Sequence, residues 1–145
     1  MSLDGYFIED LNEGMTAVFG KTITDADILM FAGVSGDTNP VHLNEEFAAG
    51  TAFQGRIAHG MLTASLISTV LGTKLPGPGC VYLSQNLKFL APVRVGDTVR
   101  AEVIITAIDR LRRRVTFATA CKVGGKSVLE GEAVTVVPRR PAPAA

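Results

Sequence analysis

A run of apolar and small residues followed by four strand-like segments constrains the fold more than any other feature of this sequence. From Gly60 to about Leu71, such side chains cover nearly the whole circumference of a predicted helix, so the helix should be buried. Alternating residues and turn signals then predict strands at 80–90, 98–108, 115–123 and 127–137. Short turns between consecutive strands allow only antiparallel pairing. The sequence therefore predicts an α+β domain with an antiparallel β-sheet wrapped around a long central α-helix.

Two further elements are predicted before this helix. Residues 16–24 alternate in the manner of a first strand. Thr24, followed by the acids Asp25 and Asp27, is typical of a helix N-terminus, and the helix should end near Gly36.

The length of 145 residues suits one domain with one core, which we place at residues 1–138. Asn44 should cap a short helix that runs through Ala49. Residues 139–145 are rich in proline and lack apolar periodicity, so we expect a disordered tail there.

Charge and cysteine content exclude several function classes. Lys plus Arg and Asp plus Glu number 14 each, so no long-range field favours nucleic acid or an anionic membrane. The apolar run at 57–75 is interrupted by polar residues and lacks the charged start of a signal peptide, which predicts no membrane span and a cytoplasmic protein. Cys80 and Cys121 lack the spacing of a zinc site and are expected to be packing residues.

The segment 36–42, GDTNPVH, holds the residues best suited to chemistry. Asp37 and His42 lie five residues apart on what Gly36 and Pro40 predict to be a stiff loop, so both side chains can converge on one water. The chain has two histidines in all, and histidine is the usual proton-transfer group near neutral pH. The alternative interpretation is an ordinary turn in which Asp37 bonds nearby amides and His42 is a partly buried histidine.

This segment, preceded by residues 31–35 and followed by His59-Gly60-Met61, resembles the signature of the MaoC-like R-specific enoyl-CoA hydratases. The resemblance extends from about Thr22 to Val137 and is looser through the strands. It implies a homodimer with the hot-dog fold. The activity it implies is syn addition of water to short trans-2-enoyl-CoA thioesters, which gives (R)-3-hydroxyacyl-CoA.

The resemblance also implies roles for individual residues. Asp37 and His42 would activate the catalytic water, and Asn39 would help to hold their geometry. The backbone amide of Gly60 would bind the thioester carbonyl, as a free amide at a helix N-terminus can. Ser68 would lie near the active site. From the residues alone, Gly60 would be a helix-start glycine and Ser68 a small packing residue.

Other groups are expected to lie outside the chemistry. An imidazolium is unfavourable beside the positive end of a helix dipole, so His59 is predicted to be structural. Four arginines, at positions 110 and 112–114, could bind the phosphates of coenzyme A, although their charge pattern favours a solvated hairpin tip. Hydration involves no redox change, so neither a metal nor an organic cofactor is expected.

Three alternatives share the predicted fold. A thioesterase would direct water at the carbonyl carbon, and the dehydratase of fatty-acid synthesis would act on acyl carrier protein. A non-catalytic acyl-CoA-binding domain would lack the proton-transfer pair, so the presence of Asp37 and His42 favours a hydratase. The exposed edge of a sheet of six strands, or a similar number, would favour a dimer.

Overall fold

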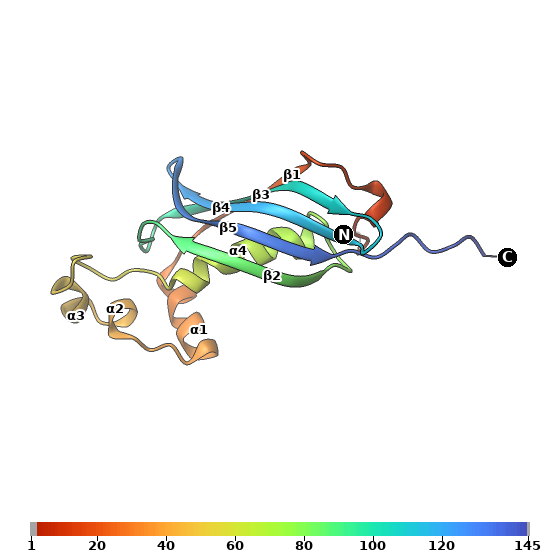
Figure 1. Ribbon diagram of the computed structural model, residues 1–145. Helices are drawn as coiled ribbons and strands as arrows, with labels where there is room; N and C mark the ends of the chain where they lie inside the picture. The colour runs from red at the N-terminus through yellow and green to blue at the C-terminus, as the bar shows by residue number, and fades with distance from the viewer. Residues whose placement is uncertain (1–2, 145) are drawn as a thin grey trace.

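The computed structural model describes residues 3–144, in which one antiparallel sheet packs against one long helix (Figure 1). The elements in chain order are the 3-10 turn η1 (Ile8–Asp10), β1 (Thr16–Thr22), α1 (Asp25–Ser35), α2 (Pro40–Leu43), α3 (Glu45–Ala49), α4 (Gly60–Thr73), β2 (Val81–Phe89), β3 (Thr98–Asp109), β4 (Arg114–Val123) and β5 (Lys126–Val136).

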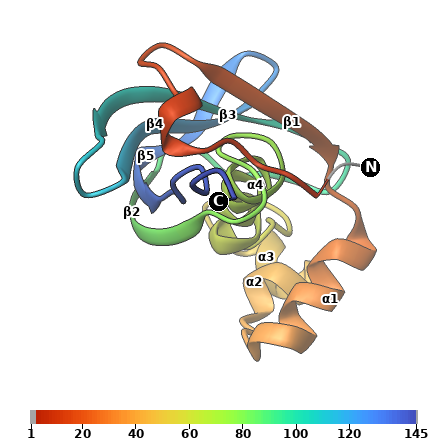
Figure 2. The same ribbon diagram turned by 90° about the vertical axis from the view of Figure 1, so that its right-hand side faces the viewer.

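The five strands lie in the order β1-β3-β4-β5-β2, and each neighbouring pair is antiparallel. Viewed from the end, the sheet curves around α4 (Figure 2). The burial of alternate residues in β4 shows that one face of the sheet is covered, because Val115, Phe117 and Cys121 are fully buried while Ala118 is exposed. The predicted antiparallel sheet around a central helix is confirmed.

The predicted limits of α1 are also confirmed. The Thr24 hydroxyl accepts a bond of 3.1 Å from the Asp27 amide, and the Asp27 carboxylate accepts one of 2.9 Å from the Thr24 amide. Gly36 ends the helix with a φ of +78°, a conformation that glycine adopts without strain. The amide of Gly36 donates to the Ala32 carbonyl, which leaves Asp37 at the start of a new segment.

The five strands of the described sheet are those that the sequence predicts, but two other features differ from the predictions. A helical turn, α2, replaces the end of the predicted loop, because Pro40 suits the first position of a helix and Asn39 caps it. One face of α4 is exposed, with Met61 at 56% and both Ser65 and Ser68 exposed, because the sheet of this chain covers only the other faces.

Both cysteines are free, and burial raises the pKa of each thiol. For Cys121 the pKa rises to about 12, through burial and then the nearby Glu102 carboxylate. A thiol held protonated in this way is a poor nucleophile. The prediction that the cysteines serve packing is consistent with these environments.

The domain limits and the disordered tail stay predictions, and residues 1, 2 and 145 of those ranges lie outside the described residues. Arg139 donates to the Leu111 carbonyl, and the amide of Arg140 donates to Glu9. Among the described residues, no helix is both long and apolar enough to cross a membrane.

Candidate active site

A cavity of about 430 Å³ opens where the segment before α2, the start of α4, the end of β2 and the start of β5 meet. Its lining is mostly apolar and includes Ile57, Phe89 and Leu129. Asp37, His42, His59 and Thr63 add polar groups at the same place. A largely apolar cavity with a few convergent polar groups is the usual form of a small-molecule site.

Asp37 reaches this cavity from the short segment between α1 and α2. Its amide donates to the Ser35 hydroxyl at 3.1 Å, and its carboxylate accepts a bond of 3.2 Å from the Asn39 amide. The Asn39 side chain in turn accepts from the Val41 amide at 3.2 Å and so caps α2. Asn39 therefore holds the geometry of the segment, although it does not line the cavity.

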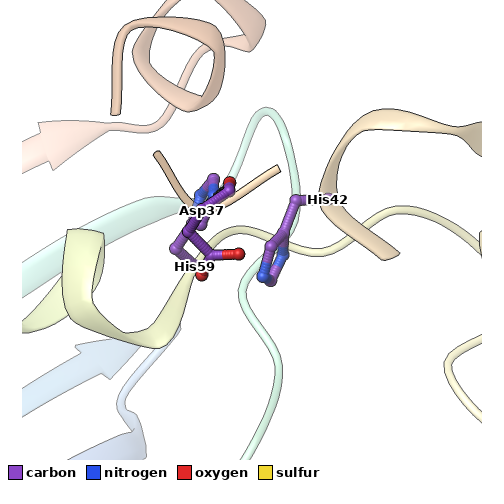
Figure 3. A group of neighbouring side chains, drawn as sticks. All are labelled: Asp37, His42 and His59. Carbon is purple, nitrogen blue, oxygen red and sulfur yellow. Dashed lines mark hydrogen bonds between the residues drawn. The ribbon is translucent and has the colours of Figure 1, made fainter. Parts of the chain in front are cut away.

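His42 lies on α2 and is 8% exposed. Its Nδ1 lies 2.8 Å from the Ile57 carbonyl, which can only accept a hydrogen bond. The neutral ring therefore carries its proton on Nδ1, and Nε2 keeps a lone pair that can accept a proton. The carboxylate of Asp37 lies beside this ring (Figure 3).

His59 also belongs to the site, which sequence reasoning missed. Its ring is 1% exposed and stacks on the ring of His42, with centroids 3.9 Å apart. Its position directly before Gly60 was a usable signal, because a residue next to a predicted oxyanion donor must lie near the substrate. Its contacts are not explained by packing alone.

Gly60 is the first residue of α4 and lines the cavity. Amides in the first turn of a helix have no acceptor within that helix, so the Gly60 amide is suited to a substrate oxygen. A Cβ atom at Gly60 would lie 2.6 Å from Cε1 of Phe89. A side chain at this position would therefore displace the ring of Phe89.

Two groups singled out from the sequence lie apart from the cavity of their own chain. Ser68 is exposed on α4, two turns beyond Gly60, and does not line the cavity. The arginines at positions 110–114 lie at the far end of the sheet, since Arg114 pairs with Val136 while the cavity lies at Leu129 of the same strand. Arg110 donates to the carbonyls of Ile8 and Leu11 at 2.7 Å.

Asp37, His42 and His59 are also the residues that could hold a metal. They offer a carboxylate oxygen and two ring nitrogens within 4.8 Å of one another, a donor set found in zinc and non-haem iron sites. A metal lies in the plane of each imidazole that binds it. The planes of the two stacked rings differ by only 31°, so the rings do not converge on one ion as they stand. That no metal is needed stays a prediction.

Arg56 connects the helices around His42. Its Nε donates to the His42 carbonyl at 2.7 Å, and its guanidinium pairs with Asp25 at 2.7 Å. Its backbone amide donates to Glu45 at 3.2 Å. A single-turn helix such as α2 has little stability of its own, so these contacts hold His42 in place.

We expect Arg56→Met to lower kcat about tenfold with little change in KM, because a small displacement of His42 weakens the proton-transfer step more than substrate binding. Steady-state kinetics with an enoyl thioester, the substrate class that the sequence resemblance implies, measures this effect. Arg112→Met, at the exposed hairpin tip, removes the same charge and should have no effect. An unchanged kcat in Arg56→Met would show that α2 is held by other contacts.

Comparisons with known proteins agree with this site. A model of the MaoC-like domain family matches residues 9–126. The (R)-specific enoyl-CoA hydratase of Rhodospirillum rubrum is 56% identical over 135 residues, which cover 93% of this chain and 94% of the relative. The 3-hydroxybutyryl-CoA dehydratase of Methylorubrum extorquens is 52% identical over 134 residues, covering 92% of this chain and 85% of that protein.

The fold agrees as well. The solved structure of the (R)-hydratase from A. caviae involved in PHA biosynthesis has a TM-score of 0.86 and 45% identity, covering 90% of this chain and 99% of the other. This similarity confirms the hot-dog fold. The family match also includes the polar residues of the cavity, from Asp37 to Thr63. The chain belongs to the MaoC-like family.

Proposed function

We propose that this protein is an (R)-specific enoyl-CoA hydratase, which adds water reversibly to short trans-2-enoyl-CoA thioesters. The observation that carries the proposal is the meeting of Asp37 and His42 at a cavity that also contains the helix-start amide of Gly60. Hydration of a conjugated thioester needs a base for water, an acid for C2 and a donor for the enolate-like oxygen. The site offers one group for each need.

His42 is the proposed base. Because Nδ1 donates to Ile57, Nε2 can take a proton from a water that the Asp37 carboxylate orients. The oxygen of that water then bonds to C3 of the substrate. The negative charge that moves to the thioester oxygen is stabilised by the Gly60 amide.

Asp37 is the proposed proton donor to C2. His42 passes the proton that it took from the water to the Asp37 carboxylate, and the resulting carboxyl group gives this proton to C2 as the enolate collapses, which leaves both residues as they began. The water that supplies the hydroxyl is held by the same two side chains that deliver the C2 proton, and a carboxylate oxygen of Asp37 and a ring nitrogen of His42 lie within 4.8 Å of one another. The hydroxyl and the C2 proton therefore reach the same face of the double bond, which gives syn addition.

Purified protein with crotonyl-CoA tests this function. We expect the ultraviolet absorbance of the conjugated thioester to fall without release of free thiol. Release of thiol would instead indicate a thioesterase. No change in either signal would contradict an enzyme for short enoyl thioesters and favour an acyl-CoA-binding role.

A homodimer is part of the same proposal. Strand β2 is an edge of the sheet, and exposed apolar side chains lie along it: Val81, Tyr82, Leu83 and Phe89. The adjacent face of α4 exposes Met61 at 56%. A long apolar edge strand is open to pairing with another chain, and a second copy can cover it through the same surface by two-fold symmetry.

We expect Leu83→Lys to shift the protein from the mass of two chains to that of one, because a buried charge without a partner destabilises an apolar interface. Light scattering after size-exclusion chromatography measures the mass. Leu111→Lys makes the same change at a residue that is 85% exposed on the β3–β4 turn, and should stay dimeric. A monomeric wild-type protein would refute the dimer.

We also propose a cytoplasmic location. The free thiols of Cys80 and Cys121 support it, because reducing compartments keep cysteines unpaired. Fractionation of cells that express the protein tests the location, and recovery in a membrane or secreted fraction would contradict it.

A further inference from the structure

His59 joins the start of α4 to both residues of the proposed catalytic pair. It is the N-cap residue of α4, yet its side chain makes no hydrogen bond to the helix. Its Nε2 instead lies 2.9 Å from the backbone carbonyl of Asp37. A carbonyl can only accept a hydrogen bond, so Nε2 carries the ring proton and donates a hydrogen bond to the backbone carbonyl of Asp37.

This bond has a particular place among the contacts of the catalytic segment. All other hydrogen bonds that the structure describes for residues 36–39 are made within residues 32–42. The bond from His59 therefore connects the segment to the main body of the fold. Without it, the position of Asp37 would depend on local turns alone.

The ring of His59 has a second role. It lies between Phe31 of α1, at a centroid distance of 4.8 Å, and His42 of α2, at 3.9 Å. The ring of His42 therefore rests against a buried side chain that is itself tied to Asp37. One residue thus fixes the relative position of the carboxylate and the imidazole.

The remaining ring nitrogen argues against a purely structural role. Nδ1 of His59 is buried and has no hydrogen-bond partner among residues 3–144. A buried polar atom without a partner lowers stability, and a phenylalanine could fill the same space without this penalty. A phenylalanine there would also lose the bond that Nε2 donates to the Asp37 carbonyl, so this bond is the feature that only the imidazole supplies.

We infer that His59 is a positioning residue, which holds Asp37 through its backbone carbonyl and His42 through ring stacking. This inference rests on the proposed hydratase function. It differs from the sequence prediction, which treated His59 as structural only.

Two substitutions separate the hydrogen bond from the packing. His59→Phe keeps a flat ring but removes the donor, and we expect kcat with crotonyl-CoA to fall about tenfold or more, with KM and thermal stability nearly unchanged. His59→Gln places an amide N–H near the former Nε2 and should recover part of the lost kcat, because it restores the donor but not the ring that contacts His42. A kcat within twofold of wild type in the Phe variant, or no recovery in the Gln variant, overturns the inference.

A second measurement is independent of activity. Amide hydrogen exchange of the peptide that spans residues 36–42 should be faster in His59→Phe than in wild type, and close to wild type in His59→Gln. Equal exchange in all three proteins overturns the inference even if kcat changes. If wild-type protein does not hydrate crotonyl-CoA, the proposed function fails, while the exchange result still decides whether His59 holds the segment.

Discussion

Asp37→Asn and His42→Gln should each lower kcat for crotonyl-CoA by about 10³-fold, because each removes a group that moves or orients a proton in the transition state. Asn keeps an oxygen that can accept from the Asn39 amide, so the fold around residue 37 should persist. We expect circular dichroism and the melting temperature to stay close to wild type. Absorbance assays at saturating substrate measure the loss of kcat.

The double variant gives a sharper version of this test. Two residues that act on one water form a unit, so removing both should cost little more than removing one. Asp109→Asn, at the exposed end of β3, is the matched control and should keep full activity. Losses that multiply in the double variant would mean that Asp37 and His42 act in separate steps.

Gly60→Ala should lower kcat/KM by about 10²-fold, which is the usual effect of losing one oxyanion donor. The new methyl group would meet the ring of Phe89 at 2.6 Å, at the mouth of the cavity. Phe89 is 53% exposed, so its ring can move away and the fold should survive. The displaced ring and the methyl group would then obstruct the approach of the thioester oxygen to the amide.

Gly72→Ala makes the same change near the end of α4, where no atom of the described residues lies within 4 Å of the new Cβ, apart from its chain neighbours and the helix backbone. This variant should be slightly more stable, by about 0.5–1 kcal/mol, because alanine favours the helix. Its activity should match wild type. Wild-type activity of the Gly60→Ala protein would show that neither the methyl group nor the displaced ring obstructs the approach to the amide.

The sheet and the central helix were predictable because their patterns are long. The alternation of Val115, Phe117 and Cys121 extends over three repeats of the strand period, and only one face of that strand can be buried. The start of α1 was predictable for a different reason. Thr24 and Asp27 make a local capping box that needs no tertiary contact.

The site was predictable in part. The spacing of Asp37 and His42 predicted their meeting, but α2 is only one turn long and gives no periodic signal. The role of His59 depends on a contact with Asp37, 22 residues away, and on a ring stack across two helices. Contacts of this kind follow from the assembled fold, and no local pattern encodes them.

The exposed face of α4 shows another limit. Ser65 and Ser68 are small enough to be read as packing residues within one chain, yet both are exposed there. Helical periodicity shows that a face carries apolar or small side chains, but it does not show which chain covers that face.

The configuration of the product tests the central claim most directly. Crotonyl-CoA is incubated with the wild-type protein, and the 3-hydroxybutyryl-CoA formed is oxidised by dehydrogenases specific for the R or the S form. We predict that all of the product is the R form, with no free thiol. Formation of the S form, of both forms, or of no hydroxyacyl product would contradict the account.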